Sequence, residues 1–265
     1  MKRNNTAFLF AGQGSQKVGM GKDFAAENAA ARAVFDMGER LTPGIKHICF
    51  DGTAEELGRT ENTQPALFLT DLAIAAALRA AGIEPAAVAG FSLGEIPALA
   101  FAGVMDAADA FRFVTLRGKS MAEASARHPG GMAAVLKLPA DTVESLCAAR
   151  REVWPVNYNC PGQISCAGCD AEIDLLCEDV KAAGGRAVKL AVSGAFHTPY
   201  MADVKPVLHT FLDNADLSAP EIPVYANRTA MPYPSDKTGI ADCLSAQVCS
   251  PVRFSDTLLR MREGG

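Results

Sequence analysis

The segment AVAGFSLGEIPALAFA, residues 87–102, sets the expected architecture of the chain. Its first part, 87–91, is an apolar run of strand length, and its second part, 93–102, has the Ala- and Leu-rich composition of a helix. The residues at 90–94 between them read G-x-S-x-G, in the strand–turn–helix context of a nucleophile elbow. Such a turn pushes the hydroxyl of Ser92 outward, beside unpaired N–H groups at the helix N-terminus. One interpretation of this segment is therefore a catalytic serine.

Strands and helices continue to alternate on both sides of this segment. Upstream, residues 6–10 predict a buried strand, and 64–81 predict a helix that ends at Gly82. Downstream, 107–126 predict a helix with Asp106 as its N-cap. Strands that alternate with helices are typical of a parallel α/β sheet.

The pattern changes at His128, where the sequence His-Pro-Gly-Gly breaks the chain. The following runs predict strand, helix, strand, strand, helix and strand at 132–138, 140–149, 153–157, 163–167, 171–183 and 187–192. This β-α-β-β-α-β order is the ferredoxin-like one. We therefore expect an inserted ferredoxin-like subdomain at 128–192 within a large α/β-hydrolase-like domain formed by 1–127 and 193–265. The returning part of the large domain is predicted to hold a strand at 222–226 and helices at 199–212, 239–248 and 252–262.

Composition excludes several classes of protein. The net charge of -5 argues against a nucleic-acid partner, and the apolar runs are too short to span a bilayer. The N-terminal apolar run is only as long as a strand, so we expect no signal peptide, a cytoplasmic protein and free thiols. Cys166 and Cys169 form a C-x-x-C with Cys160 upstream, but a structural zinc site usually needs four ligands, and we expect no metal site.

A serine nucleophile needs a base, and the chain has four histidines. His197 follows a returning strand, in the kind of loop where α/β sheets place their sites, and is the best candidate. His47 falls in an expected surface helix, His128 at the subdomain break, and His209 inside a helix. The alternative for the serine is structural, because Ser92 followed by Glu95 also reads as the helix capping box S-x-x-E.

Six motifs carry a resemblance to a known family. In chain order they are AGQGSQ at 11–16, GFSLGE at 90–95, VTLRGKSM at 114–121, NYNCPGQ at 157–163, SGAFHTPYM at 193–201 and QVCSPVRF at 247–254. Together they resemble the malonyl-CoA:acyl carrier protein transacylases and the acyltransferase domains of polyketide and fatty acid synthases. The resemblance implies transfer of malonyl from malonyl-CoA to the phosphopantetheine thiol of acyl carrier protein, by a ping-pong mechanism. It also implies a monomer in fatty acid synthesis that needs no cofactor.

The resemblance assigns roles at matching positions. Ser92 matches the nucleophile that carries the acyl ester, and His197 matches its general base. The backbone carbonyl of Gln247 matches the group that orients this histidine. The backbone N–H groups of Gln13 and Leu93 match the oxyanion hole, where such donors typically contribute about 3 kcal/mol each.

Selectivity is implied by three further positions. Arg117 matches the residue that holds the malonyl carboxylate, which suits a planar guanidinium with two parallel N–H donors; its alternative is an ordinary helix-surface arginine. Phe196 and Phe91 match the acyl pocket, where bulk beside the base disfavours a methyl branch. Two positions depart from the family: position 91 usually holds His, and Pro97 falls early in the elbow helix, where we expect a kink.

Three other functions fit parts of the sequence. A hydrolase would use the same Ser-His chemistry with water, and its acid would be Asp170, Asp174 or Asp179, all within the expected insertion. A non-enzymatic module that docks carrier proteins would keep the fold without the chemistry. Gly12-x-Gly14 is part of a nucleotide-binding fingerprint, but Lys17 stands where the third glycine is needed.

Overall fold

A short parallel sheet lies inside the larger part of the molecule. The computed structural model describes residues 6–264, and in it β1 (Ala7–Phe10), β2 (Ala87–Gly90) and β7 (Val224–Tyr225) pair in the order β1-β2-β7. The register of β1 on β2 runs from Ala7 opposite Ala87 to Phe10 opposite Gly90. β2 is the central strand, and its residues Val88 and Ala89 are completely buried. The predicted α/β class with a parallel sheet is therefore confirmed.

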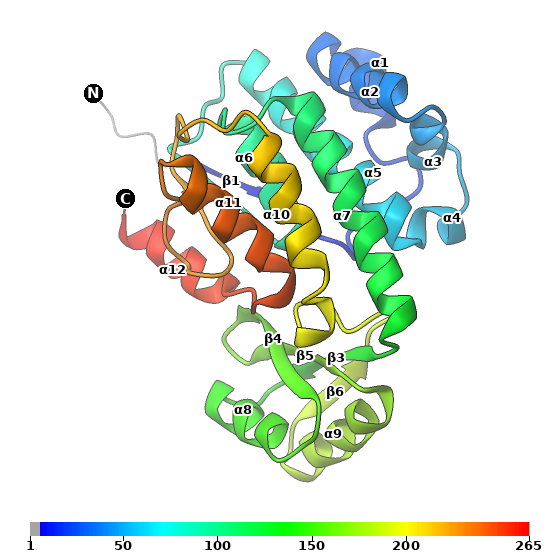
Figure 1. Cartoon of the computed structure of the whole chain (residues 1–265), viewed down its shortest axis with the longest axis vertical. Coiled ribbons are helices and arrows are strands. Elements are labelled where there is room, and N and C mark those ends of the chain that lie inside the picture. The colour runs from blue at the N-terminus through cyan, green and yellow to red at the C-terminus, as the bar shows by residue number, and fades with distance from the viewer. Residues whose placement is uncertain (1–5, 265) are drawn as a thin grey trace.

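Helices surround this sheet in Figure 1. They are α1 (Lys22–Glu27), α2 (Ala29–Leu41), α3 (Ile45–Phe50), α4 (Ala54–Gly58), α5 (Thr60–Ala80), α6 (Glu95–Phe101), α7 (Ala107–Arg127), α10 (Val204–Asn214), α11 (Lys237–Ala246) and α12 (Phe254–Glu263). Asp106 caps α7 as expected, since its side chain accepts from the N–H of Ala108. No helix within residues 6–264 is both long and apolar enough to cross a membrane.

The two longest helices, α5 and α7, approach each other closely. A Cβ added to Gly118 of α7 would lie only 3.1 Å from the carbonyl oxygen of Thr60 in α5. The rings of Phe68 and Phe111 pack between the same helices, with centroids 6.0 Å apart. This close approach brings the N-terminal half of α5 beside the middle of α7, where Arg117 lies.

The helix expected after the elbow is divided into two parts. Ser92–Gly94 form a single 3-10 turn, η1, and α6 begins at Glu95. Pro97 is consequently the third residue of α6, within the first turn, where a backbone N–H would have no partner inside the helix. Pro97 therefore removes no hydrogen bond within α6, and the kink expected there stays a prediction.

The smaller part is an antiparallel sheet with two helices on one face (Figure 1). Its elements are β3 (Gly131–Leu136), α8 (Ala140–Ala148), β4 (Val153–Cys160), β5 (Gln163–Gly168), α9 (Asp170–Ala182) and β6 (Arg186–Lys189). The strand order β4-β5-β3-β6 is that of a ferredoxin-like fold, as predicted. Val135, Ile164 and Leu176 belong to a separate small core between this sheet and its helices. The opposite face of the sheet is turned toward the larger part.

Backbone hydrogen bonds connect β4 to the larger part. The N–H of Val252 donates to the carbonyl of Val156 at 2.7 Å, and the N–H of Tyr158 donates to the carbonyl of Val252 at 2.9 Å. β4 also pairs with β5, but two register shifts interrupt that ladder, one between Pro155 and Asn157 and one between Tyr158 and Cys160. These contacts hold the open face of the small sheet opposite the end of β2.

Candidate active site

The turn after β2 has the geometry of a nucleophile elbow. Ser92 has a φ of 52°, a left-handed conformation that a non-glycine residue rarely adopts. A Cβ on Gly90 would lie 1.9 Å from the carbonyl carbon of Gly94, and a Cβ on Gly94 would lie 2.4 Å from the carbonyl oxygen of Phe10. Glycine is therefore required at both flanking positions for the turn to close.

Gly12, which follows β1, packs closely against the same turn. A Cβ at this position would lie 2.5 Å from the carbonyl oxygen of Phe91 and 2.6 Å from its ring. The ring of Phe91 packs edge-on against that of Phe254, with centroids 5.3 Å apart. The glycine noted for a possible nucleotide loop thus has a packing reason, which is the close approach of the β1 end to the elbow.

The hydroxyl of Ser92 contacts the side chain of His197. Ser92 Oγ and His197 Nε2 are 2.7 Å apart, and His197 Nδ1 lies 3.0 Å from the carbonyl oxygen of Gln247. Because a carbonyl only accepts, Nδ1 carries the proton and Nε2 is left as the acceptor for the serine hydroxyl. His197 is 4% exposed, and burial, helped by the charge of Arg117, lowers its pKa to about 4. The imidazole is therefore neutral at physiological pH and able to take a proton.

Arg117 is a buried cation beside this pair. It is 1% exposed, and burial lowers its pKa to about 10, which leaves it protonated at neutral pH. Nη1 donates to Oε1 of Gln64 at 2.8 Å, while Nη2 donates to Oε1 of Gln247 at 2.8 Å and to Oγ of Ser92 at 3.2 Å. Nε is buried without a partner within residues 6–264. Its hydrogen-bond partners are neutral groups, which leaves Nε as an unused donor; Glu95, whose charge raises the pKa of Arg117, is connected to it in the described part of the chain only through Gln247. The alternative of a helix-surface arginine is wrong.

Glu95 does not cap the elbow helix. Its carboxylate is completely buried and accepts from the hydroxyl of Tyr233, from the backbone N–H of Asn227 at 3.0 Å, and from Nε2 of Gln247 at 3.1 Å. Burial raises the pKa of Glu95, and these donors act in the opposite direction. Ser92 Oγ contacts His197 and Arg117, and the residue before α6 is Gly94, which has no capping side chain, so the capping-box interpretation of Ser92 and Glu95 is wrong.

The side chain of Gln247 connects Glu95 to Arg117. Its Nε2 donates to Glu95 and, at 2.7 Å, to the carbonyl of Ser92, so its Oε1 is left to accept from Arg117. The two acceptors hold Nε2 in place, so the amide keeps the orientation in which Oε1 accepts from Arg117. The same residue positions His197 through its backbone carbonyl. Only this backbone role was expected from the sequence.

Asn227, two residues after the end of β7, holds the elbow by two hydrogen bonds. Its Nδ2 donates to the carbonyl of Gly90 at 2.6 Å, and its Oδ1 accepts from the N–H of Ser92 at 2.6 Å. The two bonds bridge the residues on either side of Phe91 and hold the strained turn in place. Sequence reasoning missed this residue, and also Gln64 and Tyr233.

A pocket of about 220 Å³ opens between the two parts of the molecule. One wall comes from the larger part and includes Gln13, Phe91, Ser92, Arg117, Phe196 and His197. The other wall is the open face of the small sheet and includes Ala134, Asn157, Asn159, Gln163, Ser165 and Leu190. Leu93 is buried directly after Ser92. All the predicted side chains therefore gather at one place, while the oxyanion-hole role of Gln13 and Leu93 stays a prediction.

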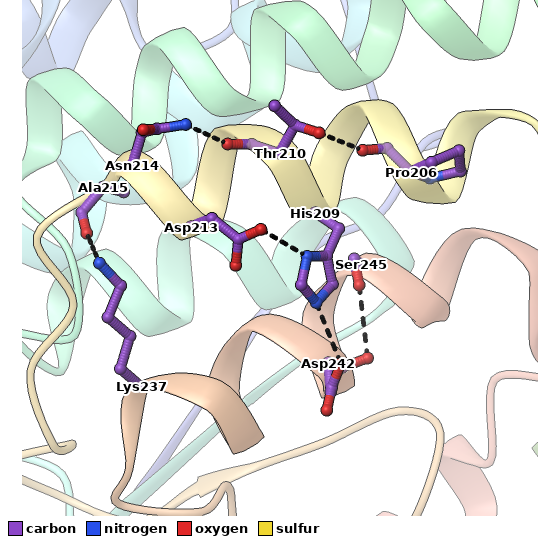
Figure 2. A network of polar contacts seen from close by, with 9 residues as sticks. All are labelled: Pro206, His209, Thr210, Asp213, Asn214, Ala215, Lys237, Asp242 and Ser245. Carbon is purple, nitrogen blue, oxygen red and sulfur yellow. Dashed lines mark hydrogen bonds and ion pairs between the residues drawn. The ribbon is translucent and has the colours of Figure 1, made fainter.

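The remaining histidines lie elsewhere. His209 of α10 contacts Asp213 on its own helix and Asp242 on α11, each at 3.0 Å (Figure 2). Both carboxylates raise the pKa of His209, and the cluster joins two helices at the surface. His128 stacks on the ring of Tyr200, with centroids 5.7 Å apart. His47 is exposed on α3, and none of these three histidines lines the pocket that holds Ser92.

Comparisons with known proteins agree on one family. The model of the acyl transferase domain family matches residues 7–265. A malonyl CoA-acyl carrier protein transacylase of Bacillus subtilis is 38% identical over 261 residues, covering 96% of this chain and 82% of that protein. A protein of the same name from Staphylococcus aureus is 38% identical over 263 residues, covering 95% of this chain and 82% of its own.

Solved structures with the same fold carry related names. An acyl carrier protein S-malonyltransferase from Vibrio cholerae superposes with a TM-score of 0.93 at 36% identity, covering 98% of this chain and 87% of that one. A malonyl transacylase solved in complex with its type II polyketide synthase acyl carrier protein has a TM-score of 0.93 at 34% identity. That match covers 98% of this chain and 86% of that one.

Proposed function

This chain belongs to the acyl transferase domain family, and on that basis we propose that it moves a malonyl group from malonyl-CoA to the phosphopantetheine thiol of an acyl carrier protein. The observation that carries the proposal is the position of Arg117, whose Nη2 lies 3.2 Å from Ser92 Oγ. A buried cation at this distance favours a short acyl group that ends in a free carboxylate.

The first half-reaction transfers the acyl group to the enzyme. Ser92 Oγ attacks the thioester carbonyl while Nε2 of His197 takes its proton, and the Gln247 carbonyl holds the imidazolium through Nδ1–H. The C–S bond then breaks, and the imidazolium returns the proton to the coenzyme A thiolate. A malonyl ester on Ser92 remains, which is the intermediate of a ping-pong mechanism.

The second half-reaction runs through the same groups in reverse. Neutral His197 takes the proton of the carrier-protein thiol, whose sulfur attacks the Ser92 ester. The C–O bond breaks, and the serine oxygen recovers the proton from the imidazolium. The backbone N–H groups of Gln13 and Leu93 stabilise the oxyanion in both steps, by about 3 kcal/mol each. The route uses only these protein groups and the two pantetheine thiols, without a cofactor.

Arg117 holds the malonyl carboxylate throughout. Its Nε lacks a partner within the described residues, and its other contacts are to neutral groups, so a carboxylate brings both a hydrogen bond and charge neutralisation. Phe196 and Phe91 line the same pocket and limit the bulk of the acyl group. Selection of malonyl over acetyl then follows from a cation that has no carboxylate among its hydrogen-bond partners in the described residues.

An orienting carbonyl in place of an acid separates this proposal from the hydrolase alternative. The hydrolase order requires Asp or Glu beside the histidine, whereas Nδ1 of His197 meets the carbonyl of Gln247. The three acids considered for that role, Asp170, Asp174 and Asp179, all belong to α9, on the far side of the small sheet. Water is therefore not the acceptor that we propose.

The covalent intermediate is the direct test. The intact mass of the protein after mixing with malonyl-CoA should increase by one malonyl group, and Ser92→Ala should abolish the increase. Ser145→Ala, at an exposed position of α8, is the matched control and should be acylated normally. Acylation that persists in Ser92→Ala would reject the assignment of Ser92, and absence of any adduct in the wild type would reject the proposed function.

A further inference from the structure

Two loops of the candidate active site meet at the first residue of α5. This residue, Thr60, is 1% exposed, and its Oγ1 lies 3.3 Å from Nε2 of Gln13 and 3.0 Å from Oγ of Ser193. Gln13 belongs to the loop that follows β1, and Ser193 belongs to the loop that follows β6. The hydroxyl of Thr60 therefore connects two segments that lie far apart in the sequence.

The two contacts use different parts of the Thr60 hydroxyl. An amide nitrogen only donates, so Oγ1 of Thr60 accepts from Nε2 of Gln13. The proton of the threonine is then free to donate to the hydroxyl of Ser193. A buried hydroxyl without partners is unfavourable, so this pair of hydrogen bonds favours one arrangement of the two loops.

On the side of β1, the contact with Thr60 attaches the loop that carries a proposed oxyanion donor. Ser15 shapes this loop from within, because its N–H and its Oγ donate to the carbonyl of Gly12 at 3.3 and 2.8 Å. The side chain of Gln13 then joins the loop to α5. Oxyanion stabilisation depends on where the donor points, so the backbone N–H of Gln13 is effective only while this loop keeps its place.

On the side of β6, the contact with Thr60 holds the segment that leads to the base. Gly194 follows Ser193 and lies against α7, where an added Cβ would be 2.0 Å from Oγ of Ser125. The chain is thus held on both α5 and α7 shortly before His197. His197 itself has a φ of 63°, an unfavourable conformation that persists only when the surrounding contacts hold it.

We propose that Thr60 is a positioning residue that sets the oxyanion donor of Gln13 and the base His197 relative to each other. This inference rests on the proposed function, in which both groups act on the same intermediate at Ser92. Thr60 is not among the described residues that line the pocket. It therefore affects the transition state through Gln13 and Ser193, and leaves the binding of malonyl-CoA alone.

The experiment removes the Thr60 hydroxyl while the shape of the side chain is kept. Thr60→Val should lower kcat for malonyl transfer about tenfold and leave KM for malonyl-CoA unchanged, because misplaced donors weaken the transition state most. Thr60→Ser retains the hydroxyl and should recover most of kcat. The matched control is Thr63→Val, since Thr63 is also buried in α5 and its hydroxyl donates to the carbonyl of Leu57. This control should lower the melting temperature as much as Thr60→Val does, with a normal kcat.

A double-mutant cycle tests whether Thr60 connects the two loops. Ser193→Ala should lower kcat less than Thr60→Val, and adding it to Thr60→Val should cause no further loss, because the shared bond is already absent. Additive losses in the double variant, or equal damage from Thr60→Ser and Thr60→Val, would overturn the proposal.

Two further outcomes of the kinetics are decisive. A normal kcat in Thr60→Val, or a rise in KM alone, would also reject the positioning role. If Thr60→Val does not fold, the exposed Ser193 decides the question, since Ser193→Ala must then lower kcat at an unchanged KM. Failure of the proposed function is distinguishable, because the wild type would then form no malonyl ester.

Discussion

The guanidinium of Arg117 lies 3.2 Å from the Oγ of Ser92, so the buried cation and the candidate nucleophile face the same point in the pocket. In the described part of the chain, the hydrogen-bond partners of this cation are the amides of Gln64 and Gln247 and the hydroxyl of Ser92. None of them is a carboxylate. A negative charge on the acyl group would therefore complete the site.

Arg117→Ala should lower malonyl transfer by tens to thousands of fold, since removing one partner of a buried charge pair costs about 2–5 kcal/mol. Acetyl transfer should change little or rise, because acetyl has no carboxylate to lose. Arg117→Lys should recover only part of the loss, as an ammonium keeps the charge but not the fork. The measurement is the ratio of kcat/KM for malonyl-CoA and acetyl-CoA in each variant. The matched control is Arg112→Ala, at an exposed position of the same helix. A ratio that stays constant would assign Arg117 to structure or to coenzyme A.

Glu95 is expected to act as a positioning residue for Arg117 through Gln247. Glu95→Ala would leave three buried donors without an acceptor, those of Tyr233, Asn227 and Gln247. Each unsatisfied group costs about 1–3 kcal/mol, so the melting temperature should fall clearly. Without Glu95 the Gln247 amide is free to turn, and Arg117 then loses its hydrogen bond to Gln247 Oε1. Loss of this one bond should raise KM for malonyl-CoA about tenfold.

Glu95→Gln should be milder than Glu95→Ala. The amide keeps an oxygen for Asn227 and Gln247, and the Tyr233 hydroxyl can accept from its nitrogen. Glu123→Ala, at an exposed position of α7, controls for the loss of a carboxylate. Equal damage from the Gln and Ala variants would show that the negative charge itself is needed.

Local sequence signals were sufficient for most of the architecture. The apolar runs predicted β1 and β2, and the order of elements predicted the ferredoxin-like sheet. Of the helices between Lys22 and Gly58, only α3 was expected, as the surface helix that holds His47, while α1, α2 and α4 were not assigned, because two of these three are short and lack a long periodic pattern. Two signals were present there: Asn28 caps α2, and Thr53 and Glu56 form a complete capping box at α4.

The site could be predicted only as far as its local motifs reach. Ser92 and His197 stand in turns with recognisable composition, whereas Asn227 and Tyr233 follow a two-residue strand with no such pattern. These residues meet the elbow through contacts that span more than 130 positions in the sequence. Their roles depend on packing, which one sequence does not reveal. Arg117 required the family resemblance, since a helical arginine is usually exposed.

Asn227→Ala should lower kcat more than it raises KM. The two hydrogen bonds at 2.6 Å hold the strained backbone around Ser92, and their loss should displace the nucleophile without removing a substrate contact. We expect a fall in kcat of about 10- to 100-fold, as misplacement of catalytic groups typically produces. Asn227→Asp keeps the acceptor for the Ser92 N–H and should be intermediate. Asn214→Ala is the control, and a rise in KM alone would contradict this positioning role.

The pH dependence should report the environment of His197. Burial, followed by the charge of Arg117, lowers the pKa of His197 to about 4, against about 6.5 in an unfolded chain. Between these values the unfolded state binds more protons, so the stability that this histidine contributes is complete above pH 6.5 and is lost as the pH falls toward 4. The full contribution is on the order of 3 kcal/mol.

The pH dependence of activity should report the titration of His197 in the folded enzyme. Because kcat/KM reports the free enzyme, its acid limb should lie near pH 4 rather than 6.5, in samples whose circular dichroism shows that they remain folded. With acetyl-CoA as the substrate, Arg117→Ala should move this limb to higher pH, since the variant lacks the second cause of the lowered pKa. Arg112→Ala should leave the limb unchanged, because its exposed side chain is paired with Asp109. An acid limb at 6.5 in the wild type would mean that the base is a solvated imidazole and not the buried His197.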